Sequence, residues 1–571
     1  MTEQQLPAWA DPSVSAASLD AQGVSRRGLL RRAGLFGAAF ALGSAATPAF
    51  AANASASASA SASASASDKK GFGGDDPHLA YLVGDHHVHS VYSHDAKYTF
   101  SQQAQAAARY GLDWMVFNEH SNFGHARYGA ALEHQEILKA RAENPRQLIF
   151  QGLEWYIPAA EHCTVFAAPG PHEVDLLTRF ELAYDGKLLG YTDGAPGGAD
   201  TARNEAHAVK AVQWLAEQRR TGYVDDVLVL ANHPLRLGID SPHEMRNWRD
   251  AAPEIVIGME GAPGAQGAAI PGWRGSTSIR GEYENKPSAN SFAGYPADAY
   301  LTYGGFDWAT ATVGGLWDSM LAEGRLFSIT TNSDNHRTVF DTWKNGDWQP
   351  GQNFDNTGRL PDPVDTDTPQ PGSDFWPGEF SRTHVGVTRY GYRAVMAGLR
   401  AGRVWLDHGH LLDGLDVRLK RDCDFGRGVT LGGRLRVRRG EKITLYVTVT
   451  TASRANPQGI LPQLAHVDVI RGAVRGPVAD LDSWQAPDTK VVRTKDVSGR
   501  NGTYTLRIPL TAGDESFYVR LRGSDGNRHG AGYLGAAIDP HGPITHEPGD
   551  GDPWADTWFY SNPIFVDVAG A

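Results

Sequence analysis

The chain has 571 residues, of which 41% are hydrophobic and 10% aromatic, an ordinary composition for a globular protein long enough to hold more than one domain. Its formal net charge of −12 argues against nucleic acid as the main partner, because nucleic-acid-binding proteins usually carry an excess of Lys and Arg. The two cysteines, Cys163 and Cys423, exclude a disulfide-rich scaffold and a Cys-rich zinc site, and leave open one disulfide between them.

The N-terminal segment has the pattern of an export signal. Residues 25–32 read S-R-R-G-L-L-R-R, an apolar run follows over residues 33–46, and Ala49-Phe50-Ala51 fits a cleavage site. We therefore expect residues 1–51 to be a twin-arginine signal peptide, with the Tat translocation machinery as partner during export and a secreted or cell-envelope destination. A membrane anchor is the alternative, which the short, Ala- and Gly-rich run disfavours, and no other stretch is long and apolar enough to span.

Residues 52–76 follow as a linker. Most of this segment alternates Ser and Ala and lacks the large apolar side chains that a packed core needs. We expect it to be disordered and to act as a spacer.

Residues 77–411 alternate short apolar runs with amphipathic stretches. The predicted buried strands are Tyr81–Val83, Trp114–Phe117, Leu148–Gln151, Thr164–Ala167, Val227–Ala231, Ile255–Met259, Phe327–Thr330 and His384–Val387. The predicted helices are Ser101–Tyr110, Glu133–Ala142, Glu205–Arg219, Val313–Ala322 and Tyr392–Ala401. Strand–helix alternation predicts a parallel sheet, and this length favours a closed α/β barrel. Two stretches rich in Gly, Pro, Trp and Asn, 261–307 and 337–382, are expected to be long functional or disordered loops.

Residues 412–571 lack helix signals and alternate apolar with polar side chains. The clearest segments are Lys442–Thr450, Ala465–Ile470, Thr503–Ile508 and Ser516–Leu521. This pattern predicts a C-terminal all-β sandwich domain, whose presence is silent about function.

Side chains that can bind metal lie close to the ends of the predicted strands of residues 77–411, and all follow a strand except His162, which opens the run H-C-T-V-F. They are His87, His89, Glu119, His120, Glu154, His162, His233, Asp334 and His336. Because the C-terminal ends of barrel strands form one mouth, we expect these side chains to converge there. Imidazoles and carboxylates without thiolates suit Zn, Mn or Fe, so the sequence predicts a multinuclear site for divalent ions.

Single motifs in this set carry little information. The chain has two H-x-H pairs, His87/His89 and His408/His410, and about one is expected by chance among 21 histidines. Alternate residues of a strand share a face, so either pair could chelate an ion. The first pair belongs to the strand-end series, whereas the second stands apart and is expected to be structural or exposed.

The order of the motifs resembles that of the polymerase and histidinol phosphatase (PHP) superfamily of metal-dependent phosphoesterases, over roughly residues 81–409. The matching segments are D-H-H-V-H-S (Asp85–Ser90), S-H-D-A (Ser93–Ala96), N-E-H (Asn118–His120), Glu154, His233-Pro234 and N-S-D-N-H (Asn332–His336). The resemblance implies a distorted (β/α)7-type barrel. The signal peptide, the sandwich and residues 317–336 and 394–405 look similar to the exported, carbaryl-hydrolase-like branch of the family.

The resemblance also implies two or three metal sites. The first would use His87, His89, Glu154 and Asp334, and Glu154 would bridge to a second completed by His162 and His233. The third would use His120 and His336. Where the family has S-D-G this chain has S-H-D-A, so either His94 or Asp95 would complete the third site, with Asp95 slightly preferred. The family's T-D-H is N-E-H here, which lengthens the supporting carboxylate at Glu119 by one carbon.

These features predict an exported phosphoesterase that hydrolyses a phosphate mono- or diester. Ions bridged by one carboxylate would activate a hydroxide for attack and stabilise the charge that develops. His94, or Asp95 if His94 is the ligand, would protonate the leaving group. Arg236, Arg127 and Arg337 follow ligand stretches and could bind a phosphate, with a surface salt bridge as the alternative for each.

Two other functions fit the same residues. A carboxylester or carbamate hydrolase needs the same activated water, and an apolar pocket without converging arginines would favour it. A non-catalytic envelope protein with a degenerate barrel is the second alternative. In both enzyme hypotheses we expect the substrate to be a small-molecule or envelope-derived ester.

Overall fold

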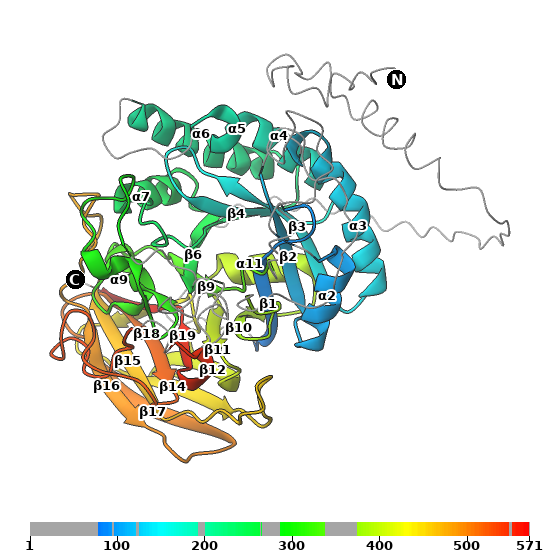
Figure 1. Cartoon of the computed structure of the whole chain (residues 1–571). Coiled ribbons are helices and arrows are strands. Elements are labelled where there is room, and N and C mark those ends of the chain that lie inside the picture. Colours follow the sequence, from blue (N-terminus) through cyan, green and yellow to red (C-terminus); the bar gives the residue numbers. More distant parts are fainter. Residues whose placement is uncertain are drawn as a thin grey trace, which may run out of the picture. The chain divides into compact units, whose positions relative to one another are not determined.

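The computed structural model describes residues 78–93, 96, 98–121, 125–191, 200–262, 264, 286–336, 374–547 and 551–569 (Figure 1). The predicted signal peptide and linker lie outside these residues, as do His94, Asp95 and Arg337. All described residues belong to one compact unit, Asp75–Ala571. None of the helices within the described ranges is long and apolar enough to cross a membrane.

A mixed sheet of 15 strands forms the framework of the α/β fold. Thirteen of its strands follow one another in the order β9, β6, β5, β4, β3, β2, β1, β10, β11, β19, β18, β20, β13, while β15 and β16 attach beside β18. In chain order the strands are β1 (Ala80–Val88), β2 (Trp114–His120), β3 (Leu148–Tyr156), β4 (His162–Ala167), β5 (Val227–Ala231), β6 (Val256–Ala262), β9 (Ser328–Thr331), β10 (Ser381–Val387), β11 (Val404–His408), β13 (Arg434–Arg438), β15 (His466–Ala473), β16 (Lys490–Asp496), β18 (Phe517–Ser524), β19 (Trp558–Ser561) and β20 (Ile564–Ala569).

The sheet curls so that its β9 edge returns to β1. Just after β9, Asn335 forms a parallel bridge with Val88, and its carbonyl accepts a hydrogen bond of 3.0 Å from the backbone N–H of His89. Strands β1 to β6 and β9 therefore surround one interior, and the C-terminal ends of strands β1 and β9 lie side by side at one rim.

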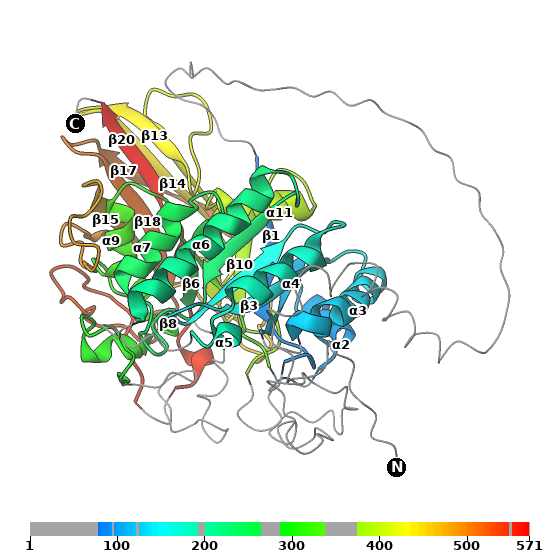
Figure 2. The same ribbon diagram turned by 90° about the horizontal axis from the view of Figure 1, so that it is seen from above.

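Helices cover the outer face of these strands, as Figures 1 and 2 show for α2, α3, α4 and α6. Local sequence sets where several begin: Thr99 and Gln102 form a capping box at α2, and Ser241 and Glu244 form another at α7, where Pro242 occupies the first turn. The helices are α2 (Phe100–Arg109), α3 (Ala130–Glu143), α4 (Glu173–Tyr184), α5 (Gly186–Leu189), α6 (Thr201–Arg220), α7 (Pro242–Ala251), α8 (Trp308–Ala311), α9 (Leu316–Ala322) and α11 (Tyr392–Arg400). Short elements are the π-helix His125–Gly129, the 3-10 helices Ala297–Tyr300 and Pro553–Ala555, and the strand pair β7 (Thr302–Tyr303) and β8 (Phe306–Asp307).

The expected all-parallel sheet is wrong. Strand β4 runs antiparallel to both β3 and β5, and β10 runs antiparallel to β1. Residues 157–161 alone connect β3 to β4, and a parallel crossover needs a dozen or more residues, so the chain can only turn back as a hairpin. Helices α4 and α7 were also absent from the predicted elements.

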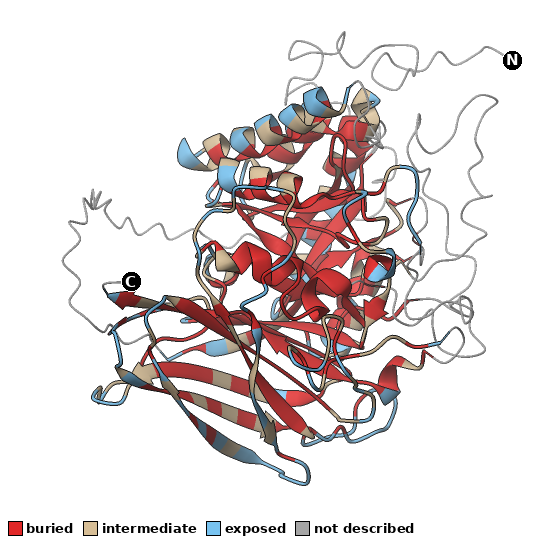
Figure 3. Ribbon diagram, turned by 90° about the vertical axis from the view of Figure 1, so that its left-hand side faces the viewer, coloured by how far each residue is buried: buried red, intermediate tan, exposed pale blue. Residues whose placement is uncertain are grey.

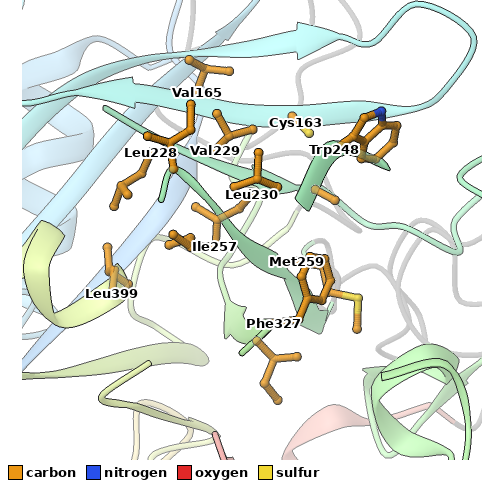
Figure 4. Close-up of a cluster of buried hydrophobic side chains, with 14 of the residues drawn as sticks. Cys163, Val165, Leu228, Val229, Leu230, Trp248, Ile257, Met259, Phe327 and Leu399 are labelled. Atoms are coloured by element: carbon orange, nitrogen blue, oxygen red, sulfur yellow. The ribbon is translucent and has the colours of Figure 1, made fainter. Parts of the chain in front are cut away.

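The inner core of this region is aliphatic and aromatic. Figure 4 shows Val165, Leu228, Leu230, Ile257 and Met259 within one cluster of buried apolar side chains on β4, β5 and β6. Cys163 is buried in the same cluster, whereas Cys423 is exposed, and both are free thiols. The disulfide that the sequence left open is therefore absent.

The C-terminal residues form a second, smaller sheet of β12 (Leu412–Arg421), β14 (Lys442–Thr451) and β17 (Thr503–Thr511). One apolar cluster draws residues from this sheet and from β15, β18 and β20 of the large sheet, so the two sheets share a core. In the outer strand β17, exposed positions alternate with buried or partly buried ones (Figure 3). The large sheet runs across the boundary predicted at residues 411 and 412, because β11 pairs with β19.

A buried ion pair joins the helical part of the chain to the C-terminal strands. The Arg520 guanidinium in β18 donates at 2.8 and 2.7 Å to the two carboxylate oxygens of Asp318 in α9, and both side chains are 0% exposed. The hydroxyl of Tyr518 donates to the same carboxylate at 2.8 Å.

We expect Arg520→Ala to lower the free energy of unfolding by about 3–5 kcal/mol, because it leaves the Asp318 carboxylate buried without its cation. Urea denaturation followed by circular dichroism measures the change. Arg475→Ala is the matched control: Arg475 pairs with Asp488 and Glu515 but is 49% exposed, so its loss should cost about 1 kcal/mol or less. Equal effects of the two substitutions would contradict this account.

Candidate metal centre

Strand pairing brings the predicted ligands to one rim of the curled sheet. His87 lies near the end of β1 and His89 directly follows it, on the same face of the chain. His120, the last residue of β2, stands opposite Glu154 of β3 in the parallel register. The antiparallel β3–β4 hairpin then sets His162 two positions beyond, opposite Tyr156.

The two remaining segments reach the site through turns. His233 follows β5, and the carbonyl of His162 accepts the backbone N–H of Asn232 at 2.8 Å. The bridge between Val88 and Asn335 places Asp334 beside the β1 histidines. His233 and Asp334 have φ of 27° and 45°, a left-handed backbone that non-glycine residues rarely adopt. Such strain persists where the surroundings hold it, and often marks functional positions.

Within the described residues, three groups of side chains have ligand atoms that all lie within 4.8 Å of one another. They are His87, His89 and Glu154; Glu154, His162 and His233; and His89, His120 and His336. These groups match the division into three sites that the sequence implied, except that His89 also joins the third. Asp334 belongs with the first, since its Oδ1 lies 3.2 Å from His87 Nε2 and 3.3 Å from His89 Nε2.

Glu154 is the common element of the centre. Its Oε1 lies 2.8 Å from His162 Nδ1 and 3.3 Å from both His87 Nε2 and His233 Nε2. Its Oε2 lies 2.7 Å from His120 Nδ1. Burial opposes ionisation of this carboxyl, but the charges of the surrounding histidines hold its pKa well below the usual range. A carboxylate that faces two histidine groups in this way can bridge two ions.

Neighbouring groups set the tautomers of the first two histidines. His87 Nδ1 donates to the Glu260 carboxylate at 2.7 Å. Ser93 gives its hydroxyl proton to Glu119 at 2.7 Å, so the Ser93 oxygen must accept from His89 Nδ1 at 2.9 Å. In the neutral rings both Nε2 atoms then carry lone pairs, as metal-binding imidazoles require.

The resulting geometry fits a divalent ion. His87 Nε2 and His89 Nε2 lie 3.1 Å apart, a separation that is bridged either by a proton on His87 or by a metal ion between the two neutral rings. Two ligand atoms bound to one tetrahedral ion are about 3.3 Å apart. Asp334 Oδ1 lies 3.2 and 3.3 Å from these two Nε2 atoms, and Glu154 Oε1 lies 3.3 Å from His87 Nε2, whereas His89 Nε2 is 3.6 Å from Glu154 Oε2.

The charge balance also calls for a cation. Burial lowers the pKa of His87, but the carboxylates of Asp334, Glu260 and Glu154 raise it well above its ordinary value, so this site draws positive charge inward. At His233, burial lowers the pKa and so does the charge of Arg236, while the Glu154 hydrogen bond raises it. The net shift of the pKa of His233 is upward.

Two buried carboxyls support the ligands without joining them. Asp85 accepts the backbone N–H groups of His87 and Ser333 at 3.0 Å each, which ties the β1 end to the loop after β9. Burial raises the pKa of Asp85 to about 7. Burial, together with the charge of Glu133, raises the pKa of Glu119 to about 7 as well, and Glu119 accepts from Ser90 and Ser93.

Sequence reasoning missed Glu260. It lies inside β6, 0% exposed, where one oxygen accepts from His87 and the other accepts the backbone N–H of His233 at 2.6 Å. The signal was a single acid in the otherwise apolar run I-V-I-G-M-E-G, which is unusual in a buried strand unless the acid has a partner.

The centre opens on one side. The side chains of Asp334, His336 and His162 are 19%, 15% and 11% exposed, whereas those of His87 and His89 are 0% exposed. Arg236 is half-buried in the turn after His233, where its backbone N–H donates a hydrogen bond of 2.9 Å to the His233 carbonyl. Arg127 is buried at 4% exposure, and burial lowers its pKa to about 10.

The other H-x-H pair is structural. His408 is buried against the ring of Phe306, with 4.4 Å between centroids, and its Nε2 lies 3.3 Å from the Thr331 hydroxyl. His410 Nε2 donates to the carbonyl of Gly378 at 2.9 Å. Neither histidine belongs to a potential ligand group among the described residues.

No family model and no curated protein matches this chain. Among solved structures, it is similar to a two-domain protein from Bacteroides vulgatus that contains a predicted PHP-like metal-dependent phosphoesterase. The two share 12% sequence identity over 84% of this chain and 99% of the other, with a TM-score of 0.29.

We expect Glu260→Gln to weaken binding of divalent ions by about 10–100-fold, because the amide removes the charge that makes His87 a better ligand. Competition with a chromophoric zinc chelator measures this affinity. The control is Glu136→Gln, which changes a surface acid that is 45% exposed on α3. Unchanged affinity in Glu260→Gln, with native circular dichroism, would remove Glu260 from the supporting role.

Proposed function

We propose that this chain is an exported metal-dependent phosphoesterase that hydrolyses a phosphate mono- or diester. The observation that carries the proposal is the convergence of five buried or nearly buried histidines on the Glu154 carboxylate, with the Nε2 atoms of His87 and His89 3.1 Å apart. The resemblance of the motifs to the PHP superfamily supports the same reaction class. Export by the twin-arginine route rests on the N-terminal sequence.

The candidate ligands divide among three ions. His87, His89, Asp334 and Glu154 would hold the first ion, and His162 and His233 would hold a second against Glu154. His120 and His336 would hold a third, with His94 or Asp95 as the further ligand. When bound, divalent ions polarise an ester oxygen and make water a stronger nucleophile at neutral pH.

The chain itself supplies orientation and charge for the substrate. Access is from the side where Asp334 and His336 are partly exposed, so the ester would approach there. Arg236 is close enough for its charge to act on His233, and it is the candidate to bind a phosphate oxygen. This cation favours a phosphate ester over the carboxylester or carbamate alternative. His94 or Asp95 would protonate the leaving group.

Metal content and turnover of His87→Ala test the proposal. Wild-type protein should carry two or three Zn, Mn or Fe ions by elemental analysis, and should cleave p-nitrophenyl phosphate or bis-p-nitrophenyl phosphate faster than p-nitrophenyl acetate. In His87→Ala we expect loss of metal and a fall in turnover of more than about a hundredfold, since a ligand matters more than its supporting residues.

His410→Asn is the control, because it changes the H-x-H pair that lies outside the centre and keeps a residue that tolerates left-handed backbone. It should keep both metal and turnover. A preference for the acetate would establish the carboxylester hydrolase instead. Wild-type protein that holds no metal, and stays inactive after Zn, Mn or Fe is added, would leave the non-catalytic alternative.

Arg236→Ala should raise KM for the preferred phosphate ester about tenfold, because a charge-assisted hydrogen bond contributes about 1.5 kcal/mol or more. The same variant should keep its metal ions and its turnover of p-nitrophenyl acetate, which has no phosphate to bind. Steady-state kinetics on both substrates give the comparison. A parallel loss on the two esters would mean that Arg236 acts on the fold and not on the phosphate.

A further inference from the structure

Three histidine rings from separate segments cluster in the C-terminal region, away from the centre at Glu154. His466 opens β15, while His529 and His541 belong to the segment of residues 525–557 that connects β18 to β19. Their ring centroids lie 5.3 Å apart for His529 and His541, 6.0 Å for His466 and His529, and 6.3 Å for His466 and His541. Two histidine pairs at the candidate metal centre have similar spacings, 5.0 Å for His87–His89 and 5.5 Å for His120–His336.

Backbone pairing brings these rings together. Gly530 and Gly542 form an antiparallel bridge, with a hydrogen bond of 2.9 Å from the N–H of Gly530 to the carbonyl of Gly542. His529 precedes Gly530 and His541 precedes Gly542, so the bridge brings these two histidines close together. His466 pairs with Ser524 at the end of β18, which is the point where the connecting segment leaves the sheet. The proximity is therefore built into the register of the fold.

His466 carries an unsatisfied nitrogen. The residue is 8% exposed, and its Nε2 is buried without a hydrogen-bond partner among the described residues. The Oδ2 atom of Asp468 lies 3.7 Å from it, beyond hydrogen-bond range, and is already bonded by Arg522 at 3.0 Å. A buried polar atom without a partner is costly, and a metal ion is one group that would satisfy this nitrogen.

The surroundings favour a cation at this position. The buried Arg522 guanidinium is paired with the carboxylates of both Asp468 and Asp539, and one positive with two negative charges leaves a net charge of −1 beside His466.

We propose that His466, His529 and His541 bind a zinc ion that fastens the connecting segment to β15, independently of the phosphoesterase centre. Their ring nitrogens do not all lie within 4.8 Å of one another, unlike the three groups at the centre. His529 is exposed, so rotation of its side chain can bring its nitrogen toward Nε2 of His466. Three imidazoles and a solvent-facing fourth position suit zinc, which prefers tetrahedral nitrogen ligation.

Zinc content of the full chain tests the proposal. Protein is saturated with zinc, dialysed and measured by elemental analysis for wild type, His529→Ala, His541→Ala and the control His172→Ala. His172 is a partly exposed histidine whose ring stacks on Tyr223, with 4.3 Å between centroids, and it belongs to no histidine group. We expect His529→Ala and His541→Ala each to lose about one zinc per chain and to keep aryl-ester turnover, and His172→Ala to lose none.

A His87→Ala background separates the two sites. His87→Ala should lose zinc from the centre and keep the C-terminal zinc, so the His87→Ala/His529→Ala double variant should hold about one zinc fewer than His87→Ala alone. In wild type, zinc should also slow proteolysis within residues 525–547, and this protection should vanish in His529→Ala. The proposal is overturned if both C-terminal variants keep the zinc content of wild type, or if zinc gives no protection from proteolysis.

Discussion

The structure of the candidate centre depends on one buried carboxylate. Glu154 is 1% exposed and stands within 3.6 Å of nitrogen atoms from five histidines, which arrive from β1, β2, β4 and the turn after β5. A carboxylate in such surroundings is tolerable only if cations compensate it. Without metal, protonated histidines such as His87 can compensate it. Divalent ions can compensate the same carboxylate while His87 and His89 stay neutral and bind through Nε2.

The sheet can bring these side chains to one rim because it contains both parallel and antiparallel strands. In an all-parallel sheet, neighbouring strands would each bring only their C-terminal ends to the rim. Because β4 returns as a hairpin, its first residue, His162, lies at the same rim as the last residues of β3. The connection is short, so Glu154 and His162 are held in register by backbone hydrogen bonds and not by loop conformation.

Much of this centre was readable from the sequence, since a polar residue that ends an apolar run is visible without knowing the fold. His87, Glu154 and His233 were found in this way. The direction of β4 was not, because Thr164–Ala167 has the same apolar pattern whichever way it runs. Glu260 lies inside a strand, and the sequence does not tell which buried acid has a partner. His466, His529 and His541 come together only through the register of segments that are far apart in the chain.

The C-terminal region bears on the centre through β9. The side chain of Asn562, next to β19, accepts the N–H of Ile329 at 2.8 Å and donates to its carbonyl at 3.0 Å, so it completes the hydrogen bonding of a four-residue strand. The same strand leads directly into Asp334 and its left-handed backbone. A strand this short gains little stability from its own pairing, and the strain at Asp334 has to be held by what surrounds it. The C-terminal strands therefore help to fix the position of Asp334 as well as enclosing their own core.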